Sequence, residues 1–184
     1  MRKKGFTLIE LLITIAVLTL ISGAVYTSFT LSQKAYRESE TSAEITQNGR
    51  VILERMNREI HQAKEIVGDF PEEKGSAEDE ITFEDGHIVD SYHYIHYFKT
   101  DKTIEREVIG YYFSGDAGQN LVPWNAIPPV GQTLLSKNLE GAKTIGEWVE
   151  GLNIWGSKII NIALTLKKQN KNFYLETKVL GRNF

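Results

Sequence analysis

The first third of the chain contains an apolar run that is long enough to cross a membrane as a helix. No charged residue lies between Leu11 and Gln33, and Lys34 and Arg37 follow the run. At about 1.5 Å per helical residue this run reaches roughly 35 Å, which exceeds the ~30 Å thickness of the hydrocarbon core of a bilayer. The pattern therefore predicts a membrane-spanning helix.

A one-sided apolar pattern follows the uncharged run. Its members recur at helical spacing and form a single stripe: Ile45, Ile52, Met56, Ile60, Ala63 and Val67. Polar and charged residues surround the stripe, and every proline lies downstream, so nothing breaks a helix before Gly68. We predict one nearly continuous helix from about Phe6 to Val67, whose second half packs on a folded domain.

Alternation of polar and apolar residues after the helix predicts antiparallel strands. The expected strands are 80–84, 92–98, 104–109, 160–167 and 173–179. The second and third form a hairpin around the polar residues 99–103, and the last two form a hairpin around residues 168–172. Residues 114–156 have weak periodicity and no definite element. A long helix packed on antiparallel strands is an α+β fold.

Composition excludes several functions. The formal net charge is -3, and Lys and Arg do not cluster after the first few positions, so no direct binding of nucleic acid is predicted. The chain has no cysteine, which excludes disulfides, thiolate metal ligands and cysteine nucleophiles. The chain therefore depends on its apolar core alone for stability.

The residues before the apolar run resemble a signal sequence but contain one charge that a signal sequence does not need. Arg2, Lys3 and Lys4 precede Gly5, and this positive cluster orients the N-terminus toward the cytoplasm. A secretory signal peptide cut after Ala24 is the alternative interpretation. Against it, Glu10 lies within the apolar stretch, where a carboxylate costs about 2.5–3.5 kcal/mol on insertion scales and therefore indicates a function with a specific partner.

Residues 2–12, Arg-Lys-Lys-Gly-Phe-Thr-Leu-Ile-Glu-Leu-Leu, resemble the prepilin leader of type IV pilins and pseudopilins. The resemblance implies that a prepilin peptidase cuts between Gly5 and Phe6 and that Phe6 becomes N-methylated. It also implies that the carboxylate of Glu10 pairs with the N-terminal amine of a neighbouring subunit in a filament. A buried charge is acceptable when it is paired in this way.

The expected order of elements is similar to that of minor subunits, specifically PilW-like minor pilins and the J-type pseudopilin of type II secretion. The aromatic hairpin and the terminal residues Val179 to Asn183 carry this weaker resemblance. Many major pilins close a disulfide loop, which a chain without cysteine cannot do. The resemblance thus implies a structural subunit, minor rather than major, of a type IV pilus, a type II secretion pseudopilus or a competence filament.

The expected organisation follows from these elements. It comprises a leader peptide at 1–5, a transmembrane and filament-core helix at 6–33, an amphipathic helix at 34–67 and an exported β-rich domain at 68–184. The expected location is the inner membrane, with one span and the C-terminal domain outside, and then an extracytoplasmic filament. The implied partners are other pilin or pseudopilin subunits, the prepilin peptidase, the inner-membrane assembly machinery and the lipid bilayer.

No catalytic residue, metal site or cofactor is predicted. The sequence lacks the phosphate-binding loop GxxxxGK[ST] and the HExxH and GxSxG motifs. His93 and His96 differ by three positions along an expected strand and would point to opposite faces. The acidic residues between Glu72 and Asp85 lack EF-hand spacing and are interpreted as a solvated linker rather than a calcium site.

Two other functions remain open from the sequence. One is a membrane-anchored or secreted extracytoplasmic binding domain that is unrelated to filaments. The other is ligand binding at a filament tip through exposed Trp124, Trp148 and Trp155, although buried tryptophans are the preferred interpretation.

Overall fold

The computed structural model describes residues 5–68, 70–87 and 92–181. Within these residues, one long helix, α1, spans Leu8–Gln62 and is followed by a short 3₁₀ helix, η1, at Lys74–Ser76 and by seven strands. By its internal contacts the chain divides into a first unit up to Ala43 and a second from Glu44, and α1 runs through the boundary. The observed fold is α+β, as the sequence predicts.

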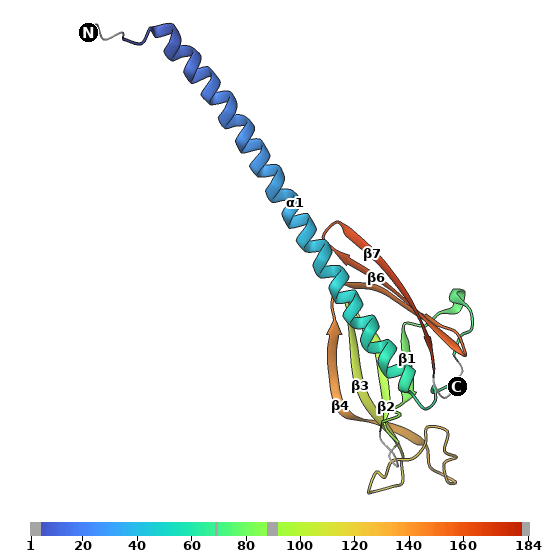
Figure 1. Ribbon diagram of the computed structural model, residues 1–184. Coiled ribbons are helices and arrows are strands. Elements are labelled where there is room, and N and C mark those ends of the chain that lie inside the picture. The colour runs from blue at the N-terminus through green and yellow to red at the C-terminus, as the bar shows by residue number, and fades with distance from the viewer. Residues whose placement is uncertain (1–4, 69, 88–91, 182–184) are drawn as a thin grey trace. The chain divides into compact units, whose positions relative to one another are not determined.

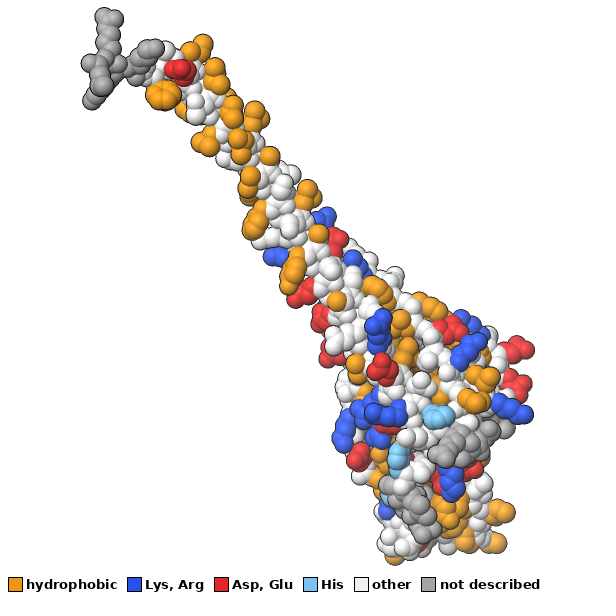
Figure 2. Space-filling view, viewed as in Figure 1, with side chains coloured by type: hydrophobic (Ala, Val, Ile, Leu, Met, Phe, Trp, Pro, Cys, Tyr) orange, Lys and Arg blue, Asp and Glu red, His pale blue; other side chains and the backbone are white. Residues whose placement is uncertain are grey.

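The first unit consists of the N-terminal part of α1, whose apolar side chains are exposed. Phe6 is 87% exposed, and the leucine, isoleucine and valine side chains of the helix up to Leu31 are all about half exposed or more. Orange side chains cover this part of the helix in Figure 2. The helix is long and apolar enough to cross a membrane. Because the rest of the described chain does not cover these apolar side chains, this part of the helix requires lipid or other helices around it.

Threonine hydroxyls in the first unit bond to the backbone of their own helix. Thr14 donates to the carbonyl of Glu10, Thr19 to that of Ala16, and Thr27 to that of Gly23, at 2.7 to 2.9 Å. These bonds give each threonine hydroxyl a partner within its own helix. Such partners are needed in a bilayer, where no water is present to bond to the hydroxyl groups.

The second unit contains two antiparallel sheets among the described residues. The first sheet has the order β1-β2-β3-β4 and the second has the order β5-β6-β7. The strands are β1 Glu80–Glu84, β2 Tyr94–Thr100, β3 Thr103–Phe113, β4 Leu134–Gly146, β5 Val149–Trp155, β6 Ile159–Lys168 and β7 Lys171–Leu180. Both sheets pack beside the C-terminal part of α1 (Figure 1).

The predicted apolar stripe of the helix forms the centre of the core. Ile45, Ile52, Met56 and Ile60 are fully buried in one cluster with side chains from both sheets. Gly49 allows the helix to approach the second sheet, because a Cβ there would meet the side chains of two leucines, Leu175 and Leu166. The prediction that this stripe docks on the sheets is confirmed.

The helix ends five residues before the predicted Val67. After Gln62 the backbone bonds to the edge of β1: Lys64 N–H donates to Glu84 O at 3.0 Å, and Val67 N–H donates to Thr82 O at 2.9 Å. Edge pairing supplies these backbone groups with partners that one more turn of helix would otherwise provide. The predicted helix end is therefore wrong. Ala63, the stripe residue that follows Gln62, is nevertheless fully buried.

The strand at 80–84 and both hairpins are confirmed, but both turns are tighter than expected. Thr100 pairs with Thr103, and Lys168 pairs with Lys171, so each loop has two residues. The first residues of these loops, Asp101 and Gln169, have φ values of 49° and 54°. Positive φ is typical of the two-residue turns that suit twisted hairpins.

Residues 114–156 contain strands β4 and β5, which the sequence did not place. Most residues of β4 are exposed or half exposed, because β4 is an edge strand, and its pairing with β3 contains three register shifts. Such shifts break the two-residue alternation from which a strand is recognised. The remaining loop between β3 and β4 exposes Ile127 and Val130.

A polar network of side chains joins the helix to the first sheet. The Glu59 carboxylate accepts a hydrogen bond from the Tyr97 hydroxyl at 2.8 Å and pairs with Arg106 Nε at 2.9 Å and Arg55 Nε at 3.3 Å. Arg106 also contacts Glu140 at 3.4 Å. Glu59 is one of the charged residues that surround the apolar stripe, yet its side chain is only 13% exposed, so not every charged residue beside the stripe faces solvent.

Burial of Tyr94 makes the second unit less stable at alkaline pH. Tyr94 is fully buried, its hydroxyl accepts the Trp124 backbone N–H at 3.0 Å, and burial raises the pKa of its phenol to about 12. Since folding favours the neutral phenol, its stabilising contribution is complete below about pH 10 and is lost as the pH rises from about 10 to about 12.

We therefore expect the free energy of unfolding to fall more steeply between about pH 10 and 12 in the natural chain than in Tyr94→Phe. Urea unfolding of the detergent-solubilised chain, followed by tryptophan fluorescence, measures both slopes. Tyr97, whose pKa burial also raises, contributes equally to both chains and cancels in the comparison. Parallel slopes would contradict the assignment to Tyr94.

Candidate functional site

The N-terminal end of α1 is organised by a reciprocal pair of side chains. Thr7 immediately precedes the helix, and its N–H and Oγ1 both donate to Glu10 Oε2 at 2.9 Å. In return, Glu10 N–H donates to Thr7 Oγ1 at 3.4 Å. This arrangement is a capping box, in which the first and fourth residues of Thr-x-x-Glu satisfy donors that the helix leaves free. The Thr7-to-Glu10 spacing is a sequence signal for this capping box, but the helix prediction from the sequence did not include it.

Glu10 remains accessible although it caps the helix. The residue is exposed, and in the part of the chain that the structure describes its carboxylate accepts hydrogen bonds from Thr7 alone. A cationic group brought to this end of the helix from another molecule therefore finds an acceptor. A carboxylate in the first turn of a helix also interacts favourably with the partial positive charge of the helix N-terminus.

The residues of the predicted cleavage point precede the capping box. Gly5 and Phe6 are exposed, and an added Cβ at Gly5 would meet no other atom within 4 Å. The leader residues Arg2, Lys3 and Lys4 lie outside the described residues.

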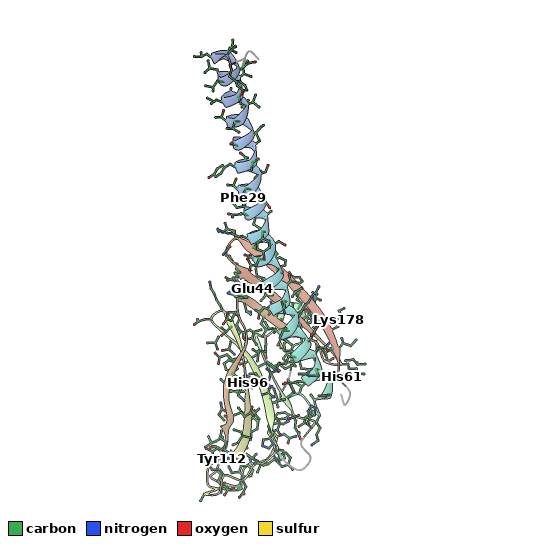
Figure 3. All side chains as sticks on the ribbon, turned by 60° about the vertical axis from the view of Figure 1, so that its left-hand side comes forward. Phe29, Glu44, His61, His96, Tyr112 and Lys178 are labelled. Carbon is green, nitrogen blue, oxygen red and sulfur yellow. The ribbon has the colours of Figure 1, made fainter. Side chains whose placement is uncertain are left out.

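Two histidines of the second unit, His87 and His96, contact acidic residues within hydrogen-bond distance. His96 belongs to β2 of the first sheet and is labelled in Figure 3. It lies between Glu107, 3.0 Å from its Nδ1, and Glu80, 3.3 Å from its Nε2, so its two nitrogens face different carboxylates. His93 precedes β2, so the expected strand alternation does not apply to it. Within residues 5–68, 70–87 and 92–181, no three His, Asp or Glu side chains are arranged to hold a metal ion.

The acidic stretch that was interpreted as a solvated linker is in part structural. Glu84 is 5% exposed, and its carboxylate lies 2.7 Å from Lys64 Nζ. The hydrogen bond to Glu84 raises the pKa of Lys64. Glu84 ends β1, and its backbone also bonds to the segment after α1, which explains its burial.

The three tryptophans differ in exposure. Trp155 is buried at 9% exposure, whereas Trp124 and Trp148 are partly buried. The Trp124 indole N–H donates to Glu65 at 2.7 Å, and Lys168 Nζ lies 3.7 Å from the centre of the Trp148 ring. The preference for buried tryptophans is therefore confirmed for Trp155 and met only in part by the other two.

Comparison with known proteins identifies the N-terminal segment. Residues 1–26 match the family described as the prokaryotic N-terminal methylation motif. The match covers the leader, the capping box and most of the apolar run, and it supports a type IV pilin-like protein with an N-terminal membrane anchor. Searches of curated proteins and of solved structures found no match.

Proposed function

We propose that this protein is a structural subunit of an extracytoplasmic filament of the type IV pilin kind, and a minor subunit rather than the major one. The observation that carries the proposal is the methylation motif at residues 1–26, which continues directly into an exposed apolar helix. A helix with this surface is stable in a bilayer before assembly and between other helices afterwards.

Processing precedes assembly in this proposal. A prepilin peptidase cuts between Gly5 and Phe6, and the new N-terminal Phe6 is methylated. Arg2, Lys3 and Lys4 hold the leader in the cytoplasm, so the second unit is exported. The exposure of Gly5 and Phe6 is consistent with access by the peptidase. The expected boundaries at 1–5, 6–33, 34–67 and 68–184 belong to the same proposal.

Glu10 is the assembly residue. Its carboxylate pairs with the Phe6 amine of a neighbouring subunit, which compensates two charges that are costly in lipid. The accessibility of the carboxylate supports this role.

The lack of cysteine and the order of the strands favour a subunit of the PilW-like or J-type pseudopilin kind. Its partners are then other pilin or pseudopilin subunits, the prepilin peptidase and the inner-membrane assembly machinery. The filament is a type IV pilus, a secretion pseudopilus or a competence filament. The role is structural and needs no catalytic residue or cofactor.

The intact mass of the protein from membranes of the producing cell tests the proposal. We expect the chain to lack residues 1–5 and to carry one added methyl group. The expected change depends only on the leader, so a Gly5→Leu variant, which blocks the small-residue cleavage point, should retain its full mass. Loss of residues 1–24, or an unprocessed natural chain, would instead favour a secreted or membrane-anchored binding domain.

A further inference from the structure

Strand β7 is the outer strand of the second sheet (Figure 1). A free edge presents backbone N–H and C=O groups to other strands, and proteins usually cover or interrupt such edges. Among the described residues, 64–67 bond to the edge of β1, Glu78 and Ile154 of β5 exchange backbone hydrogen bonds, and three register shifts interrupt the pairing of β4. In contrast, β7 pairs with β6 along its whole length without a register shift, so its outer edge is regular and open.

Alternate residues of β7 direct their backbone groups to this open edge. In an antiparallel pair, residues that bond to the partner strand alternate with residues whose backbone groups face away from it. The Leu180 carbonyl faces away from β6, because it lies 2.7 Å from His61 Nδ1 of α1. The alternation gives Lys178, Glu176 and Tyr174 the same direction, and no turn or loop of the described chain bonds to their backbone groups. Each of the three therefore offers a donor and an acceptor to an added strand.

A groove between α1 and β7 adjoins the open edge. It measures about 210 Å³ and is lined by residues of both elements, namely Arg50, Leu53, Glu54, Asn57 and 175–177. An added strand would direct every second side chain to this side of the sheet, because side chains alternate between the two faces of a sheet. Leu53 belongs to the core and Leu175 packs against it, so the groove favours an apolar side chain opposite Leu175.

The direction of β7 identifies the added strand as part of a different protein. β7 runs beside α1 in the same direction, because a Cβ at Gly49 would meet Leu175 whereas His61 contacts Leu180. If β7 of a second copy paired antiparallel with this edge, α1 of that copy would point the opposite way. The two helices could then not enter one membrane from the same side, as the proposed function requires. The other sheet edges of a second copy are covered or interrupted within the described residues.

The charge of Lys178 indicates the chemistry of the added strand. Lys178 is exposed, whereas Glu176 on the same face already lies 3.8 Å from Lys74 Nζ. Opposite charges directly across an antiparallel pair are stabilising, and like charges are destabilising. An acidic residue opposite Lys178 is therefore favoured. The apolar residue opposite Leu175 then follows it by three positions, because the added strand runs antiparallel to β7.

We propose that the edge of β7 and the adjoining groove bind an extended segment of a different exported protein, which adds a strand antiparallel to β7. The segment carries an acidic residue opposite Lys178 and an apolar residue opposite Leu175. Main-chain hydrogen bonds supply affinity in this mode of recognition, and side-chain pockets supply specificity. The orientation and the export of the partner rest on the proposed function. Because the partner is a different chain, the contact joins one partner and does not propagate, which agrees with a minor subunit.

Photo-cross-linking in the producing cell tests the edge. The photoreactive residue is introduced as Tyr174→p-benzoylphenylalanine, at a side chain that is 53% exposed, and as a control at Tyr112 of the interior strand β3. We expect the chain labelled at position 174 to form an adduct with an extended segment of a different protein, about four residues after an acidic residue, since Tyr174 is four positions from Lys178. The control should not form this adduct. No adduct, an adduct with a second copy, or an adduct with a helical segment would overturn the proposal.

A backbone substitution in the cross-linking chain tests the mode of binding. Glu176→Pro removes an N–H that faces the open edge and leaves the bonds to β6 in place, so the adduct should decrease about tenfold. Glu176→Thr, the matched control, keeps the N–H and should leave the yield within about twofold. Equal yields from the two variants would show that the partner does not pair with the backbone of β7.

A charge substitution tests the occupant independently and does not depend on the folding of the proline variant. Lys178→Glu should lower the adduct several-fold, because it places a like charge opposite the acidic residue of the partner. Lys178→Arg keeps the charge and should retain the adduct. A yield that Lys178→Glu leaves unchanged would overturn the acidic segment as the occupant.

Intact mass separates this inference from the proposed function. A chain that lacks residues 1–5, stays in the membrane and forms no adduct at position 174 overturns the inference alone. A chain cut after Ala24 overturns the filament role, whatever the adduct shows.

Discussion

Glu10→Ala is expected to leave the protein processed and in the membrane but to reduce its incorporation into filaments to background. In the proposed filament the substitution removes the charge that pairs with a neighbour's amine. It also removes the capping acceptor for Thr7. The charge pair dominates, because an unpaired N-terminal amine among packed helices costs several kcal/mol, whereas loss of a cap costs about 1 kcal/mol. Immunoblotting of sheared filaments against the membrane fraction measures incorporation.

Two further variants separate the roles of the carboxylate. Glu10→Gln keeps an acceptor oxygen that can complete the capping box but has no charge, so incorporation should still be lost. Thr7→Val removes the hydroxyl while the backbone N–H and the charge of Glu10 remain, so incorporation should be largely retained. Normal incorporation of Glu10→Gln would show that charge pairing is not the function of this residue.

Glu59→Ala is expected to lower the free energy of unfolding of the second unit by about 3 kcal/mol. The side chains of Glu59 and Arg106 are only 13% and 12% exposed, so removal of the carboxylate leaves a poorly solvated guanidinium and the Tyr97 hydroxyl without their partner. Burial lowers the pKa of Arg106, but the hydrogen bond and charge of Glu59 outweigh it and raise the pKa. The pair with Glu140 keeps the expected loss at the lower end for such networks.

Glu54→Ala is the matched control, because Glu54 is an exposed acidic residue of the same helical segment. Its effect should stay within about 0.5 kcal/mol. Urea unfolding in detergent, followed by tryptophan fluorescence, compares both variants with the natural chain. Equal effects of the two substitutions would contradict a special role for the Glu59 network.

The sequence by itself determined the elements whose signals are local. The uncharged run, the stripe of Ile45 to Ile60 and the alternation in β6 each repeat with the period of one element, so helix, hairpin and α+β class could be predicted. The leader and Glu10 were recognisable for the same reason, because consecutive residues carry the methylation motif.

Only the tertiary structure decided which polar side chains are buried and which strands lie at the edges of the sheets. β4 is an exposed edge strand with register shifts, so its residues carry little alternation. Glu59 and Glu84 look like solvated charges until Arg106 and Lys64 are brought to them across long sequence separations. The helix ends before its predicted end because β1 offers its edge to the backbone. Partners distant along the chain leave no periodic signal, and only the folded chain brings them together.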